Sequence, residues 1–233
     1  MKEKSKNQDS ERLGVTDFLK FMHDGQPEWS LLAVKAPIEE VSEEFADFHG
    51  ANTIAKDVPR KPGAEYDDVE TLVAVVQVKG NPWTIIFRSL LYVDDSHLEA
   101  VAEDAKELSA RLGTRAVTFI GEDTSGANAF KLFEKGKLLE DVEWENGGDF
   151  FRFKSSLRKR PPLESVDDEF VDGIFRELGV YLPACYPMSE RGDSWLAVEK
   201  DSLEVVERAD LIELPQGEEE DECHECWFHV SIL

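Results

Sequence analysis

Cysteine and long apolar runs are scarce in this chain of 233 residues. Its three cysteines, an odd number, do not make a disulfide framework, which agrees with a reducing compartment. No apolar run approaches the roughly 18 to 20 residues that span a bilayer, and the first ten residues hold no apolar segment of a secretion signal. We therefore expect a cytoplasmic protein.

Sequence motifs for nucleotide binding and nucleophilic catalysis are also missing. The chain has no Gly-x-Gly-x-x-Gly or Gly-x-x-x-x-Gly-Lys-Ser/Thr loop and no Gly-x-Ser-x-Gly elbow. Its five histidines are scattered, so they suggest no catalytic triad, and paired carboxylates are too common here to be diagnostic. We expect no cofactor, and the sequence favours a non-catalytic protein over an enzyme.

Basic residues are scarce relative to acidic residues, which outnumber them about two to one. The chain has 26 Lys plus Arg against 50 Asp plus Glu, so its net charge is 26 − 50 = −24. The negative electrostatic field of this charge repels nucleic acid and anionic membranes, whose binding depends on Lys and Arg. The same field favours a basic protein partner. The alternative is that the charge only maintains solubility.

Residues 69–91 are the strongest strand signal and read as a β-hairpin around the breaker at residues 79–82. Successive side chains of a strand point to opposite faces. Leu72, Ala74, Val76 and Val78 share one face of the first arm, while Val73, Val75 and Gln77 share the other. Because both faces are mostly apolar, we expect both to be covered and the hairpin to lie inside a sheet.

Amphipathic helices and further strands surround this hairpin. A helix at residues 37–48 ends at Gly50, and a second helix opens at a capping box of Ser96 and Glu99 and ends at Gly113. The expected strands are residues 29–35, 53–58, 115–121, 128–134 and 137–144. This order predicts an α+β fold with a mixed, largely antiparallel sheet, built around a central hairpin and covered by helices.

Turn residues and a charge block at residues 146–162 mark the best domain boundary. We expect a disordered terminus at residues 1–12, a main α+β domain at 13–150 and a C-terminal α+β extension at 151–233, packed on the first. The extension contains a helix signal from Ser165 to Leu178 and a strand near residues 209–214.

Two thiols and two imidazoles lie close together near residue 226, namely Cys223, His224, Cys226 and His229. These are ligand types that Zn²⁺ prefers, but a lone Cys-x-x-Cys lacks the second pair that a closed zinc site needs. A redox pair would need a βα context that is absent here. We therefore expect free thiols beside a C-terminal strand and no metal site.

The loop from Asp123 to Asn128 begins Asp-Thr-Ser-Gly and resembles the Asp-Thr-Gly loop of aspartic proteases. Ser125 stands where the first glycine of that loop belongs, and a single copy could supply two carboxylates only across a dimer. We expect a structural turn here. The main alternative function, an enzyme or small-ligand binder, would use a pocket near this loop.

One basic block interrupts the acidic sequence, and it is interleaved with phenylalanines. The block consists of Arg152, Lys154, Arg158, Lys159 and Arg160. Its composition suits a nucleic-acid contact, but the surrounding charge favours pairing with acidic groups, within the chain or across a dimer. The opposite block, residues 218–222, is five consecutive carboxylates.

These observations predict an acidic, non-catalytic binding protein that is inhibitor- or immunity-like and acts on a basic protein partner, as a monomer or homodimer. In architecture and charge it is similar in a general way to the small acidic α+β proteins that bacteria use as immunity proteins or toxin inhibitors. A structural or scaffolding subunit is the remaining alternative. The predicted partner-binding residues are Glu39, Glu40, Glu43 and Glu44 on the first helix and Glu99, Glu103, Asp104 and Glu107 on the second.

Overall fold

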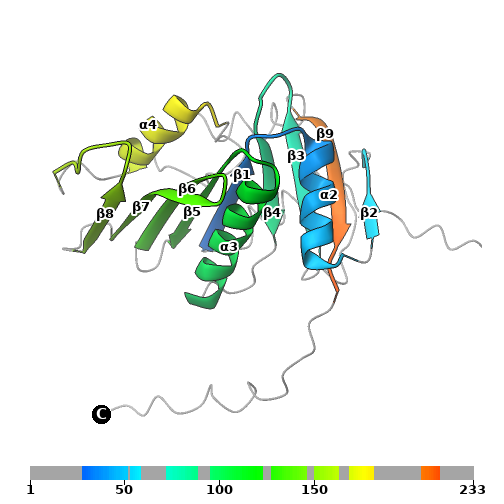
Figure 1. The fold of residues 1–233 in the computed structure, drawn as a ribbon, viewed down its shortest axis with the longest axis horizontal. Coiled ribbons are helices and arrows are strands. Elements are labelled where there is room, and N and C mark those ends of the chain that lie inside the picture. The colour runs from blue at the N-terminus through cyan, green and yellow to red at the C-terminus, as the bar shows by residue number, and fades with distance from the viewer. Residues whose placement is uncertain are drawn as a thin grey trace, which may run out of the picture.

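The computed structural model of the chain describes residues 28–51, 53–58, 72–88, 95–122, 127–145, 150–162, 168–180 and 206–215. Runs of strands are separated by single helices along these residues (Figure 1). In chain order the elements are β1 (Glu28–Val34), α2 (Ile38–His49), β2 (Thr53–Ala55), β3 (Leu72–Val78), β4 (Thr84–Arg88), α3 (Asp95–Arg111), β5 (Arg115–Glu122), β6 (Ala127–Glu134), β7 (Lys137–Glu145), β8 (Phe151–Ser155), α4 (Asp168–Leu178) and β9 (Val206–Glu213).

The nine strands of the described ranges lie in one sheet, in the order β2-β9-β3-β4-β1-β5-β6-β7-β8. Every neighbouring pair in this order is antiparallel. Residues beyond 150 supply β8 to one edge, and they supply β9 between β2 and β3 near the other. The α+β class and the large antiparallel sheet are confirmed, while the expected disordered terminus lies outside the described residues.

Strands β3 and β4 pair as an antiparallel hairpin. Val76 pairs with Ile85 and Val75 with Ile86, and the connecting turn uses Gly80 at φ 71°. These four paired residues are buried, with at most 2% of each exposed. The alternation also holds, since Val76 and Ile85 pack into one apolar cluster, and Val75 and Ile86 pack into a second cluster on the opposite face.

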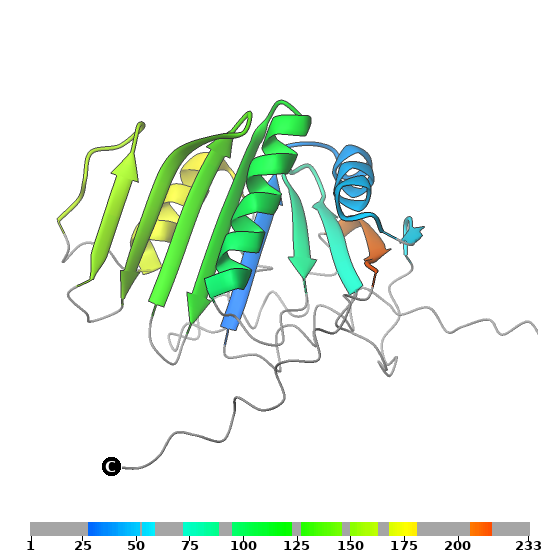
Figure 2. The ribbon, with the colours of Figure 1, turned by 60° about the horizontal axis from the view of Figure 1, so that its bottom comes forward.

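Helices α2 and α3 cover one face of the sheet. The apolar stripe of α2 includes Val41 and Phe45, and that of α3 includes Ala105 and Leu108, all fully buried in the same cluster. Figure 1 shows both helices in front of the strands, and Figure 2 shows α3 there from a second side. Helix α2 ends at Gly50, whose φ of 62° gives the left-handed stop expected from the sequence.

Helix α4 packs on the opposite face. The ring of Phe175 meets the rings of Phe119 and Phe130 edge to face, at centroid distances of 6.0 and 5.6 Å. The indole Nε1 of Trp83 donates to the carbonyl oxygen of Leu178 at 3.1 Å. Because Trp83 lies at the β3–β4 turn, this bond ties the end of α4 to the hairpin.

The start of helix α3 differs from the expectation. Helix α3 begins at Asp95, so Ser96 lies inside its first turn and not before it. The capping residue was therefore placed one or two positions too late, an offset that is common at helix ends.

Gly136 is expected to be the more sensitive of two turn glycines to substitution. Lys135 and Gly136 connect β6 to β7 with φ of 52° and 77°, and a Cβ at position 136 would lie 2.9 Å from the Cβ of Ala110 in α3. Gly80 has a similar φ of 71° but open space around its Cβ position. We expect Gly80→Ala to lower the free energy of unfolding by about 1–2 kcal/mol, from backbone strain alone. Gly136→Ala should cost about 1–3 kcal/mol more through overpacking.

Urea denaturation of the two variants measures this difference. Equal losses for Gly80→Ala and Gly136→Ala would show that α3 does not pack against the β6–β7 turn as described.

Candidate interaction surface

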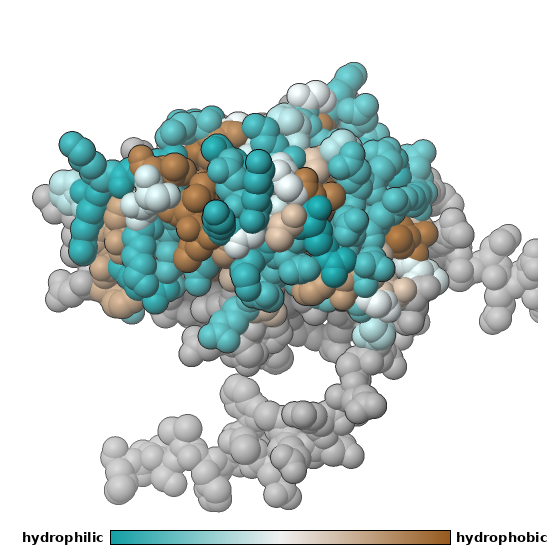
Figure 3. All heavy atoms as spheres, in the orientation of Figure 1, coloured by the Kyte–Doolittle hydropathy of each residue, from teal (hydrophilic) through white to brown (hydrophobic). Residues whose placement is uncertain are grey.

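Helices α2 and α3 lie side by side and form an acidic surface over one face of the sheet. Helix α2 has five Asp and Glu and no Lys or Arg, and α3 has five Asp and Glu with one Lys and one Arg. The two helices together therefore contribute 2 − 10 = −8 of the net charge of −24. In Figure 3 this face is largely hydrophilic over the two helices. We call it the α2–α3 face.

Most of the predicted partner-binding residues point outward from this face, and one does not. Glu39, Glu40, Glu43, Glu99 and Glu103 are exposed, and Glu44 and Glu107 are half-buried. Asp104 is buried, with 4% exposed, and its Oδ1 lies 2.9 Å from Nε2 of His49 on α2.

The position of Asp104 has a simple geometric reason. It lies three residues after Val101 and four before Leu108, and both of these are buried against the sheet. Spacings of three and four place residues on one side of a helix, so Asp104 belongs to the margin of the buried stripe. Its inclusion among the exposed partner-binding residues was therefore wrong.

One guanidinium joins the two helices across their exposed edges. Arg111 on α3 donates to Glu107 at 2.7 Å within its own helix, and its Nη1 lies 2.9 Å from Asp47 and 3.4 Å from Glu44 on α2. These carboxylates, Glu107 first, raise the pKa of Arg111. The same guanidinium lies 5.4 Å from the centre of the Phe48 ring. Arg111 thus fixes the spacing of the two helices while partly neutralising their acidic surface.

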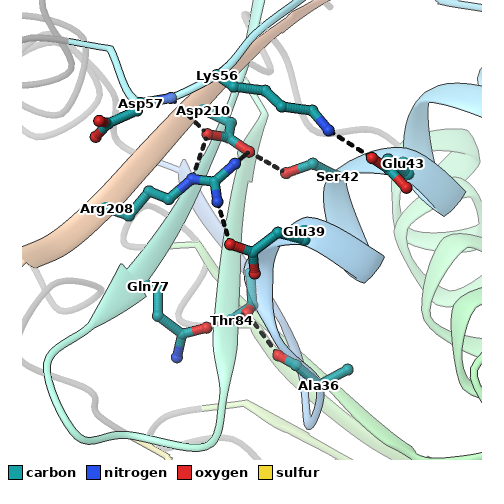
Figure 4. A network of polar contacts seen from close by, with 10 residues as sticks. All are labelled: Ala36, Glu39, Ser42, Glu43, Lys56, Asp57, Gln77, Thr84, Arg208 and Asp210. Carbon is teal, nitrogen blue, oxygen red and sulfur yellow. Dashed lines mark hydrogen bonds and ion pairs between the residues drawn. The ribbon is translucent and has the colours of Figure 1, made fainter.

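A buried carboxylate anchors α2 to the sheet (Figure 4). Asp210 on β9 is fully buried, and each of its oxygens accepts two hydrogen bonds. Its Oδ2 accepts from Ser42 Oγ on α2 at 2.9 Å and from Arg208 Nη2 at 3.0 Å. Its Oδ1 accepts from the backbone N–H of Asp57 at 2.8 Å and from Arg208 Nε at 3.0 Å. The buried charge is therefore fully paired.

Arg208 extends this network to the exposed surface. Besides its two bonds to Asp210, it forms an ion pair with Glu39 in the first turn of α2. The hydrogen bonds to Asp210 are the largest cause of the raised pKa of Arg208. Close by, Lys56 forms an ion pair with Glu43. Helix α2 is thus held by β9 and by residues just after β2, at the cost of part of its free negative charge.

Sequence reasoning missed the Arg208–Asp210 network, although a signal was present. Arg208 and Asp210 are two residues apart in a strand and so lie on the same face. The same face of β9 carries the buried Ile212, so a charged pair on it needs partners from an element packed above. Sequence alone gave no means of naming Ser42, which is 168 residues away.

Two of the five cations in the basic block after β7 form ion pairs within the chain. Arg158 forms ion pairs with Glu140, whose side chain is fully buried, and with Glu177 of α4 at 2.8 Å. Arg152 contacts Asp141 at 3.2 Å and also pairs with Glu143. For these two arginines the expectation of intramolecular pairing is confirmed. Lys154 and Lys159 are exposed and form no ion pair with any described residue.

The remaining candidate residues carry no described site. Residues 123–126 of the proposed pocket loop lie outside the described residues, and Asn128 is buried on β6. Cys223, His224, Cys226 and His229 also lie outside them. Within the described ranges, no group of three or more His, Cys, Asp or Glu could hold a metal ion, and no helix is long and apolar enough to cross a membrane.

Comparison with known proteins gives no relative for this chain: no family model, no curated protein and no solved structure matches it. The function must therefore be argued from the surface itself.

Proposed function

We propose that this chain is an acidic, non-catalytic binding protein, inhibitor- or immunity-like, which binds a basic protein partner through the α2–α3 face. The observation that carries the proposal is the charge of −8 on two adjacent helices that share one face of the sheet. A concentrated field of one sign attracts a partner of opposite sign before contact and speeds its association.

Rigidity supports this proposal as much as charge does. The bonds from Ser42 and Arg208 to Asp210 fix α2 on the sheet, and Arg111 fixes α3 beside α2. Carboxylates that are held in place lose less conformational freedom on binding than carboxylates of a chain segment without such supports. The α2–α3 face is thus pre-organised for recognition.

Two carboxylates of this face are best placed to contact a partner. Glu40 on α2 and Glu99 on α3 are exposed, and neither forms an ion pair with a described residue. Glu39, Glu43 and Glu103 are paired with Arg208, Lys56 and Lys106 respectively. A basic partner would have to displace or share those cations, so Glu40 and Glu99 should contribute most to its attraction.

We further propose that the β3–β4 hairpin is the core around which the sheet is organised and that the protein acts in the cytoplasm. The central place of the hairpin is supported by the burial of Val75, Val76, Ile85 and Ile86 and by its contribution to both apolar clusters. The cytoplasmic location is supported by the low and odd number of cysteines.

Reversing Glu40 and Glu99 to Lys should slow association with the partner by about tenfold or more, because the reversal removes attraction and adds repulsion at the face. The melting temperature should change little, since exposed charges contribute little to stability. The partner is first captured from a lysate of the source organism with the tagged chain, and association rates are then measured by stopped-flow fluorescence.

The matched control reverses Glu145 and Glu207, which are exposed on β7 and β9. Both double variants have a net charge of −24 + 4 = −20. An equal loss of rate in the two variants would assign the effect to overall charge and would contradict the α2–α3 face as the binding surface.

A further inference from the structure

Strand β8 forms one edge of the sheet, and no described strand pairs with its outer side. On its inner side, the N–H of Ser156 donates to the carbonyl oxygen of Leu139, next to β7, at 2.9 Å. Alternate residues of an antiparallel strand bond to opposite sides, so Phe151, Phe153 and Ser155 direct their N–H and carbonyl groups outward. Such a row of backbone groups is a template for pairing with another strand.

The sequence of β8 suits pairing with itself. Two copies related by a twofold axis place Phe153 opposite its counterpart and Phe151 opposite Ser155 of the second copy, with the outward backbone groups bonded to each other. The rings of Phe151 and Phe153 lie 6.0 Å apart and pack against the apolar cluster under α4. Aromatic pairs across strands stabilise a sheet. An open β8 edge would therefore favour association of two copies.

Residues 156–162 run back along the outer side of β8, and we call them the strap. The chain reverses at Ser155, whose Oγ accepts from the N–H groups of Leu157 at 2.9 Å and Arg158 at 2.8 Å. In Figure 2 the chain leaves the arrowhead of β8 and returns beside it, on the side away from β7. The strap thus lies where an added strand would have to lie.

Two arginines hold the strap in this position. Arg158 forms ion pairs with the buried Glu140 of β7 and, at 2.8 Å, with Glu177 of α4. Arg160 Nη2 donates to the carbonyl oxygen of Phe151 at 3.3 Å, and its guanidinium lies 4.8 Å from the centre of the Phe151 ring. Arg158 therefore fixes the beginning of the strap, and Arg160 occupies an outward acceptor of the edge.

The strap covers the edge without extending the sheet. No backbone hydrogen bond joins the strap to β8 among the described residues. The strap ends in Pro161 and Pro162, and proline has no N–H with which to pair. A second β8 would have to displace Arg160 from the carbonyl oxygen of Phe151 before it could bond there.

We propose that the strap blocks self-association of this protein, with Arg160 keeping β8 from pairing with β8 of a second copy. Lys154 adds a second barrier. In the twofold register it lies opposite Arg152 of the second copy, so the pairing sets like charges face to face. This inference does not depend on the α2–α3 face, which is built from other elements.

Sedimentation equilibrium on the full chain tests the proposal. Lys154→Thr with Arg160→Ala removes both barriers, and threonine favours a strand. The matched control, Lys154→Thr with Lys159→Ala, has the same net charge of −24 − 2 = −26 but retains Arg160. We expect the Arg160 variant to self-associate at least about tenfold more tightly than the control. Both should melt close to wild type, because these side chains are exposed.

Amide hydrogen exchange locates the contact. The outward N–H of Phe153 should become protected as the concentration of the Arg160 variant rises, and it should exchange rapidly in wild type and control. Equal association of the two double variants, or an Arg160 variant that stays monomeric up to about 1 mM, would overturn the proposal. Association without protection at Phe153, or concentration-dependent protection there in wild type, would overturn it as well.

Discussion

Val76→Asp is expected to unfold the protein. Val76 has no exposed surface and lies between Ile85 on β4 and Ala209 on β9. An unpaired carboxylate in such a position costs several kcal/mol, which is comparable with the total stability of about 5–15 kcal/mol for a typical domain. Circular dichroism should show the loss of the cooperative thermal transition.

The control is Lys79→Asp, three residues further on, where the side chain is exposed in the hairpin turn. It introduces the same carboxylate into water and should melt close to wild type. A Val76→Asp protein that melts within a few degrees of wild type would show that the hairpin is not the core of the sheet.

Asp210→Ala is expected to cost about 3–5 kcal/mol of unfolding free energy, because it leaves a guanidinium without its main partner next to the core. The substitution removes the acceptor of Arg208 and also those of Ser42 Oγ and the Asp57 N–H. Asp210→Asn should cost less, since an amide oxygen can still accept from Ser42 or Asp57. Urea denaturation of the wild type, Asp210→Ala and Asp210→Asn measures the two losses of unfolding free energy.

Glu213→Ala is the matched control, because Glu213 is also on β9 but is exposed and accepts a single bond from Thr53. Its loss should change stability by about 0.5 kcal/mol or less. A loss of similar size for Asp210→Ala and Glu213→Ala would contradict the anchoring role of Asp210. The pre-organised α2–α3 face would then lose one of its supports.

Local patterns were sufficient to predict most elements of the sheet. The alternation in residues 72–78 and the Gly50 and Gly113 stops each depend on a few adjacent residues, and the structure has strands and helix ends at these places. The order of the strands was not predictable in this way. Strand β9 pairs with β3 across a separation of about 130 to 140 residues, and nothing local marks that pairing.

The acidic face was predictable as two charged helices, but its internal partners were not. The spacing of the glutamates showed which residues α2 and α3 would expose, whereas Asp104 lies at the margin of the stripe, where spacing alone is ambiguous. The cations that partly neutralise the face come from distant elements, as Arg208 does from β9. Such long-range pairs depend on the sheet order and so could not be read from the sequence.

The salt dependence of partner association tests the central claim most directly. The association rate of the wild-type chain with its captured partner is measured between 0.01 M and 0.15 M salt, where the screening length falls from about 30 Å to about 8 Å. If the α2–α3 face recognises a basic partner, the rate should fall by at least about tenfold over this range, and the Glu40→Lys, Glu99→Lys variant should lose most of that dependence. A wild-type rate that does not change with salt would contradict electrostatic recognition and leave the net charge of −24 with a role in solubility alone.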